Sequence, residues 1–130
     1  MRPCGRIHEA TTVASAEVEV WGSGMPRREF IYVDDLADAC LFAFERYEGA
    51  EPINLGTGST TSIRELAETI RDVVGYRGGL TFDASKPDGM PFKGLDSQPL
   101  HGLGWKPTHS LREGLEKTYT WFRKRPALSI

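Results

Sequence analysis

The sequence has little that would support a disulfide-bonded or zinc-dependent protein. It contains two cysteines, Cys4 and Cys40, and three histidines, His8, His101 and His109, which are scattered along the chain. Two cysteines are too few for the scaffold of a small secreted protein, and no Cys or His cluster has the spacing of a zinc site. We therefore expect no disulfide framework, no metal site and no catalytic histidine, because isolated histidines are more often packing or surface residues.

A strong charge of one sign and a long apolar run are also lacking. Sixteen Lys and Arg against eighteen Asp and Glu give a formal net charge of −2, which provides no global field to attract nucleic acid or an anionic membrane. Residues 1–16 include charged side chains and no apolar run, so they resemble neither a signal peptide nor a membrane span. We expect a cytoplasmic protein without nucleic-acid or membrane partners, which binds any anion through locally placed cations.

The familiar nucleotide-binding and catalytic motifs are missing as well. The sequence has no P-loop and no nucleophile elbow, and no tyrosine is followed four residues later by lysine. Gly56-Thr57-Gly58 looks like a dinucleotide-binding turn, but Thr61 replaces the third glycine of that fingerprint, and no carboxylate ends a clear second strand. We interpret residues 56–58 as a structural turn, and expect neither a cofactor site nor catalytic residues in this chain.

Hydrophobic patterning predicts several short strands. Residues 17–21 alternate with period two, which indicates a half-buried strand, and residues 30–33, 53–55 and 80–82 are short β-favouring runs. The stretch 83–104 is rich in Pro, Gly and Asp and indicates a long, shaped loop.

Three helices are predicted by their starting signals and apolar spacing. A pair of aspartates is expected to cap a helix over residues 34–49, and Ser-x-x-Glu capping boxes begin helices over residues 62–75 and 110–122. The order of strands and helices predicts an α/β fold with a small sheet and three main helices.

Two local features could bind an anion. Arg27 and Arg28 follow the glycine-rich turn 22–26, and a guanidinium beside open backbone amides suits a phosphate or diphosphate. A solvated surface pair is the alternative, and we expect it to describe Arg27. The loop 86–93 combines two prolines, a glycine and two lysines, so its shape is expected to be fixed in advance.

Four short sequence motifs can be read together. They are Val20-Trp21-Gly22-Ser23-Gly24, Val33-Asp34-Asp35-Leu36-Ala37, Asn54-Leu55-Gly56-Thr57-Gly58 and Lys86-Pro87-Asp88-Gly89. With them, the sequence resembles the GDP-L-fucose synthases from about Arg6 to Phe122. The first three motifs are shared among nucleotide-sugar epimerases and dehydratases of the extended short-chain dehydrogenase/reductase class, whereas the fourth is the most specific for the fucose synthase branch.

The resemblance concerns the C-terminal part of that family. Its members bind NADP on an N-terminal Rossmann domain, which also holds the catalytic Ser and Tyr-x-x-x-Lys. They convert GDP-4-keto-6-deoxy-mannose to GDP-L-fucose by epimerisation at C3 and C5, followed by reduction of the C4 ketone with NADPH. The resemblance implies that residues 1–130 form a single C-terminal substrate-binding domain that lacks the Rossmann half and is inactive alone.

The same resemblance gives a candidate substrate site of five residues. Arg6, Trp21 and Arg28 match family residues that contact the GDP-sugar, and Asp88 and Lys93 match positions in the loop that closes over it. Their chemistry suits these roles, because the three cations can offset a diphosphate and the indole can form an aromatic wall.

Two other functions remain open, and partners are expected in each case. The chain could be half of another nucleotide-sugar epimerase or dehydratase, although the loop 86–93 argues against this. It could also be a stand-alone, non-catalytic binding or interaction module. Strands near Phe30 and Ile53 would expose edges without the Rossmann domain, so a homodimer is expected.

Overall fold

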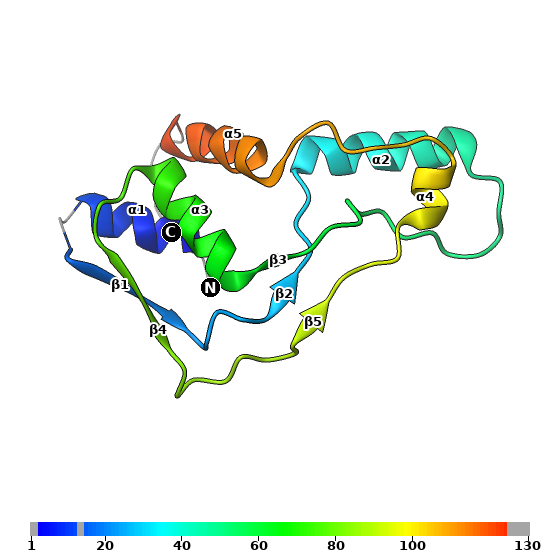
Figure 1. The fold of residues 1–130 in the computed structure, drawn as a ribbon. Coiled ribbons are helices and arrows are strands. Elements are labelled where there is room, and N and C mark those ends of the chain that lie inside the picture. Colours follow the sequence, from blue (N-terminus) through cyan, green and yellow to red (C-terminus); the bar gives the residue numbers. More distant parts are fainter. Residues whose placement is uncertain (1–2, 13–14, 125–130) are drawn as a thin grey trace, which may run out of the picture.

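The computed structural model describes residues 3–12 and 15–124, which form five helices and two small sheets (Figure 1). In chain order the elements are α1 (Pro3–Thr12), β1 (Glu17–Trp21), β2 (Arg27–Arg28), α2 (Val33–Arg46), β3 (Thr61–Ser62), α3 (Ile63–Val74), β4 (Gly79–Asp83), β5 (Phe92–Lys93), α4 (Gln98–Gly102) and α5 (Leu111–Lys124). The α/β class with small sheets is confirmed. Among these described residues, no helix has the length and apolar character needed to span a membrane.

The two sheets bring distant segments together. β1 runs parallel to β4, with Val18 opposite Leu80. β2 lies between β3, which is antiparallel to it, and β5, which is parallel, so that Arg28 stands opposite Lys93. The second sheet therefore joins the turn after β1 to the loop that follows β4.

The buried apolar side chains of the described residues form two separate cores. One lies between α1, β1 and α3 and includes Ile7 and Ile70, with side chains of α5 packed against it. The other lies between α2 and α4 and is built on Ala39, Leu100 and Trp105. Figure 1 shows the corresponding grouping, with α1, α3 and α5 near β1 and β4, and α2 with α4 beyond the second sheet.

Both predicted capping boxes are confirmed. Ser62 Oγ accepts a hydrogen bond from the Glu65 amide at 3.1 Å, and the Glu65 carboxylate accepts one from the Ser62 amide at 2.8 Å. The same reciprocal pair joins Ser110 and Glu113 at the start of α5. At the other end of α3, Gly75 adopts φ +76°, the left-handed conformation that glycine enters without strain.

The predicted strands at 30–33 and 53–55 are absent. These segments have β-favouring side chains, but they find no strand partner in the described part of the chain, and a strand is defined by such pairing. The predicted loop 83–104 also differs, because it contains β5 and α4. The strands predicted at 17–21 and 80–82 are confirmed as β1 and β4.

Two helices differ from the prediction. α2 begins at Val33 and ends at Arg46, before Gly49, and its N-cap has no side-chain hydrogen bond. The expected aspartate cap is wrong for Asp35, because Thr108 and His109, which are distant in the chain, bind its carboxylate.

The sequence did not predict α1, because Gly5 interrupts the helical pattern. Burial of Ile7 in the first core favours this helix.

We expect Ser62→Ala to lower the free energy of unfolding by about 1 kcal/mol, because it removes the acceptor for an α3 amide. Thermal or urea unfolding would measure the change. Ser62→Thr is the control, since threonine retains the hydroxyl and should preserve most of the stability. Equal stability of Ser62→Ala and the parent chain would contradict a stabilising cap.

Candidate functional site

Arg28 and Lys93 form a pair of cations on the second sheet. They occupy paired positions of the parallel strands β2 and β5, so both side chains leave the same face. The strands are held by hydrogen bonds from the Arg27 amide to the Pro91 carbonyl at 2.9 Å and from the Glu29 amide to the Lys93 carbonyl at 3.3 Å. None of the ion pairs among residues 3–12 and 15–124 joins either cation to a carboxylate. The Arg28 guanidinium donates to the Arg27 carbonyl at 2.8 Å, and a carbonyl leaves its positive charge uncompensated for an anion.

Asp88 fixes the loop beside this pair. Its two carboxylate oxygens accept hydrogen bonds from the amide and the hydroxyl of Ser23, each at 2.7 Å. Gly22 is in a left-handed conformation with φ +90°, and a Cβ there would lie 2.4 Å from Asp88 Oδ1, so only glycine permits this approach. Asp88 thus ties the 86–89 segment to the turn after β1, and a Cβ at Gly89 would lie 3.9 Å from Arg28 Nη2.

Trp21 and Arg6 border a small apolar cavity of about 120 Å³ between β1, α1 and α3. Trp21 is 55% exposed, and its indole N–H donates to Glu19 at 3.1 Å. The Lys86 ammonium lies 5.8 Å from the centre of the indole ring, within reach of a cation–π attraction. The structure therefore brings the five predicted site residues into two groups: Arg28 with Lys93 and the Asp88 loop, and Trp21 with Arg6.

Arg27 is exposed at the surface, as expected, but the segment before α3 provides partners for its guanidinium. Its guanidinium donates to the hydroxyl of Thr60 at 3.1 Å and to the Thr60 carbonyl at 2.5 Å, and lies 3.6 Å from the Glu65 carboxylate. Successive residues of a strand point to opposite faces, so Arg27 braces the segment before α3 while Arg28 lies on the other face of the sheet.

The turn at residues 56–58 does not fit a dinucleotide. The Gly58 amide donates to the Glu29 carboxylate at 2.9 Å, and a Cβ at Gly56 would lie 2.4 Å from the same carboxylate. A diphosphate would have to displace this anion from the amide. The interpretation of 56–58 as a structural turn therefore agrees with the geometry.

Glu29 also joins this turn to the segment after β5. Its second carboxylate oxygen accepts from the Leu95 amide at 2.9 Å. Burial raises the pKa of Glu29, but the hydrogen bonds from Leu95, Gly58 and Thr57 outweigh it and hold the pKa below its ordinary value. The sequence gives no local signal for this residue, because its three partners are distant in the chain.

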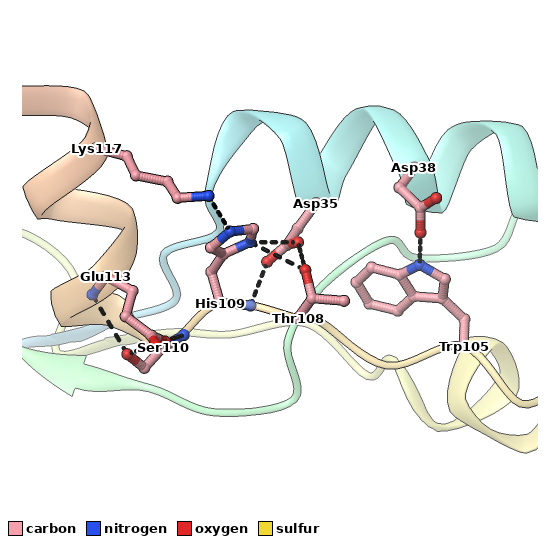
Figure 2. A network of polar contacts seen from close by, with 8 residues as sticks. All are labelled: Asp35, Asp38, Trp105, Thr108, His109, Ser110, Glu113 and Lys117. Carbon is pink, nitrogen blue, oxygen red and sulfur yellow. Dashed lines mark hydrogen bonds and ion pairs between the residues drawn. The ribbon is translucent and has the colours of Figure 1, made fainter. Parts of the chain in front are cut away.

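A second polar cluster centres on Asp35, which is 3% exposed (Figure 2). Its carboxylate accepts from the Thr108 hydroxyl at 2.6 Å and from the His109 amide at 3.0 Å, and lies 2.9 Å from His109 Nδ1. Burial raises the pKa of Asp35, but these hydrogen bonds lower it to about 2. Asp35 thereby fixes α2 to the segment that precedes α5.

The cluster extends along both helices. His109 Nε2 lies 2.7 Å from the Lys117 ammonium, which fits an imidazole that donates from Nδ1 and accepts at Nε2. Further along α2, Asp38 accepts from the Trp105 indole at 2.8 Å (Figure 2). His109 and Lys117 also line a cavity of about 670 Å³ between α5 and residues 30–34.

Metal-binding clusters of three or more His, Cys, Asp or Glu are absent from the described residues. Cys40 is exposed and free, whereas the side chain of Cys4 lies outside the part that the structure describes.

Comparison with known proteins finds similar sequences and structures. Residues 4–56 match the model of the NAD dependent epimerase/dehydratase family. Over about nine-tenths of its length, the chain is homologous to GDP-L-fucose synthases. It is 54% identical to GDP-L-fucose synthase 1 of Arabidopsis thaliana over 119 residues, which are 92% of this chain and 37% of that protein.

Two further comparisons agree with this homology. The chain is 52% identical to the GDP-L-fucose synthase of Escherichia coli K12, covering 90% of this chain and 39% of that protein. The structure of a GDP-L-fucose synthetase from Naegleria fowleri bound to NADP aligns with a TM-score of 0.85 and 29% identity, over 93% of this chain and 38% of that one. The chain thus spans well under half the length of these relatives.

We expect Asp35→Asn to lower the stability most at neutral pH. A folded-state pKa of about 2 against an ordinary aspartate value of 3.8 corresponds to about 2 kcal/mol of stabilisation. Because the folded pKa is depressed, this contribution is full above the unfolded pKa and is lost as pH falls toward the folded one. Urea unfolding from about pH 6 to about pH 2 should show the gap between parent and variant closing with acid. Asp34→Asn, an exposed neighbour, is the control, and a gap independent of pH would contradict the assignment.

Proposed function

We propose that this chain is the GDP-sugar-binding part of a GDP-L-fucose synthase. The observation that supports it most is the pair Arg28 and Lys93, which share one face of a sheet, have no carboxylate partner in the described chain and lie beside a loop held by Asp88. Two cations without a carboxylate partner in the described chain, next to a preformed loop, suit the diphosphate of a nucleotide sugar.

Each of the five residues has a chemical role in this proposal. Arg28 offers a planar guanidinium for bidentate hydrogen bonds to the diphosphate, and Lys93 adds a point charge. Arg6 and Trp21, which border the apolar cavity, contact the nucleotide or sugar end of the ligand. Both oxygens of Asp88 are taken by Ser23, so we assign Asp88 to positioning the loop.

In the whole enzyme, the reaction is epimerisation and reduction of GDP-4-keto-6-deoxy-mannose, with NADPH as the hydride donor. The described residues do not fit NADP at the 56–58 turn, because Glu29 occupies the Gly58 amide. We therefore propose that the cofactor and the proton-transferring residues come from an N-terminal Rossmann domain, which accounts for the length of the relatives that this chain does not span. A cytoplasmic, homodimeric enzyme remains part of this proposal.

Two alternatives differ in what they bind. Another nucleotide-sugar epimerase or dehydratase would use the same fold with a different nucleotide or sugar, whereas a stand-alone module would bind GDP without needing any further domain. Identity of 54% to a GDP-L-fucose synthase favours the fucose synthase hypothesis. Comparing the affinities for GDP and UDP distinguishes this hypothesis from the first alternative.

We expect the pure chain to bind GDP weakly, with a dissociation constant of about 1 mM, because only part of the pocket is present. Arg28→Ala should weaken binding about tenfold or more, beyond detection, since it removes a charge-assisted contact. Isothermal titration calorimetry or ligand-observed NMR would measure both.

The matched control is Arg77→Ala. Arg77 is exposed in the turn between α3 and β4 and makes no hydrogen bond or ion pair with another described residue. Arg27→Ala is unsuitable as a control because Arg27 supports the fold. Equal loss of affinity in Arg28→Ala and Arg77→Ala, or tighter binding of UDP than of GDP, would contradict the proposal.

We further expect the chain alone to oxidise no NADPH in the presence of GDP-4-keto-6-deoxy-mannose, because the proposal assigns hydride and proton transfer to another domain. Absorbance of NADPH over time is the measurement, with the E. coli relative as the positive control. Turnover by the pure chain would show that the chemistry resides within these residues.

A further inference from the structure

Arg64, in the first turn of α3, is a cation outside the five proposed site residues. Its Cζ atom lies 3.8 Å from the centre of the Phe82 ring on β4, a stacking distance for a planar cation on an aromatic face. Its guanidinium Nη2 donates a hydrogen bond to the Ser23 carbonyl at 3.1 Å. None of the ion pairs in the described part of the chain joins Arg64 to a carboxylate. Arg64 therefore connects α3 and β4 to the turn after β1.

The turn that Arg64 contacts has little rigidity of its own. Gly22 and Gly24 flank Ser23 with φ of +90° and +79°, and a glycine-rich turn of this kind samples many conformations unless other groups hold it. The Arg64 amide donates to the Gly24 carbonyl at 2.9 Å, while its side chain binds the Ser23 carbonyl. Two consecutive carbonyls of the turn are therefore fixed by one residue of α3.

Ser23 carries this contact onward to the loop. Its amide and its hydroxyl donate to the two carboxylate oxygens of Asp88, each at 2.7 Å, and its hydroxyl accepts from the Met25 amide at 3.1 Å. The amide and the hydroxyl can reach one carboxylate together only in a narrow range of backbone orientations, because hydrogen bonds weaken steeply when misaligned. The position of Asp88 thus depends on the orientation of the Ser23 peptide.

We propose that Arg64 is a positioning residue for the GDP site. It orients Ser23, which holds Asp88 and thereby keeps loop 86–93 beside Arg28, since a Cβ at Gly89 would lie 3.9 Å from Arg28 Nη2. The inference rests on the proposed function and adds a residue that acts on the ligand through others. Among the described residues, the hydrogen bonds of Arg64 reach Ser23 and Gly24 but not the loop.

Two other roles for Arg64 predict different results. A cation that attracts GDP by its charge alone would be replaceable by lysine and would act independently of Asp88. A residue needed only for folding would lower the stability of the whole chain without a selective effect on the loop. The experiments below separate these roles from positioning.

Backbone NMR relaxation of the ¹⁵N-labelled chain tests the contact directly. Arg64→Ala removes the guanidinium and keeps the α3 amide, so the fold should persist. The amide order parameters of turn 22–24 and of segment 86–89 should fall from about 0.85 to below about 0.6. Asp88→Ala should loosen segment 86–89 alone, because Arg64 still holds the turn.

GDP titration of the same variants measures the consequence for binding. Arg64→Ala should raise the dissociation constant about fivefold, from about 1 mM to about 5 mM, because the loop is no longer ordered in advance. In the Asp88→Ala background, Arg64→Ala should have little further effect, since both changes remove the same support. Arg64→Lys keeps the charge but not the planar group that stacks on Phe82, so it should restore the affinity only in part.

Arg71→Ala is the matched control. Arg71 lies in the last turn of the same helix, and its guanidinium pairs with Asp72 at 3.2 Å, so its loss should change neither loop motion nor GDP affinity. An ordered 86–89 segment in Arg64→Ala would overturn the proposal, as would an equal effect of Arg64→Ala with and without Asp88. If Arg64→Ala does not fold, Arg64→Lys decides the question: loop order and GDP affinity equal to those of the parent chain would overturn the proposal.

The proposed function and the role of Arg64 can fail separately. A loop that loosens in Arg64→Ala in a chain that binds no GDP would refute the proposed function and retain Arg64 as the residue that positions the loop. GDP binding that Arg64→Ala leaves unchanged would refute the role of Arg64 and leave the proposed function intact.

Discussion

The carboxylate of Glu29 joins three segments that lie beside the short strands β2, β3 and β5 of the second sheet. It accepts hydrogen bonds from Gly58 and Thr57 on one side and from Leu95 on the other, directly after β2. The second sheet has strands of only two residues, whose few ladder bonds could not fix its geometry alone. Because Glu29 remains ionised, its charge-assisted bonds keep β2 and β5 in register and thereby set Arg28 opposite Lys93.

The second core depends more on polar contacts, and less on apolar burial, than the first core does. Its buried members Ala39, Leu100 and Trp105 are few, so apolar burial there provides less stabilisation than in the first core. Polar anchors supplement it: Asp35 binds Thr108 and His109, and Asp38 binds the Trp105 indole. The inner face of α2 therefore combines these carboxylates with the apolar side chains Ala39, Phe42 and Ala43, which pack in the same core.

Local signals predicted the elements that depend on local interactions. The Ser62 and Ser110 capping boxes and the alternation in β1 could be read from the sequence, because partners three residues apart or a period of two determine them. The strands predicted at 30–33 and 53–55 were wrong, because strand formation depends on pairing with a strand that is distant in the sequence. The candidate cation Arg28 came from resemblance, whereas the bonds of Arg27 to Thr60 and of Asp35 to His109 depend on contacts across 33 and 74 positions, which no sequence pattern contains.

The order of loop 86–93 before binding decides how much conformational entropy the loop would lose when a ligand binds. An unanchored loop would lose conformational entropy on closing over a ligand. Here the carboxylate of Asp88 binds Ser23, and the Pro91 carbonyl accepts from Arg27, so both ends are held before any ligand arrives. Preorganisation of this kind reduces the cost of ordering. The cost of ordering loop 86–93 therefore contributes little to the weak GDP binding that we propose for this chain.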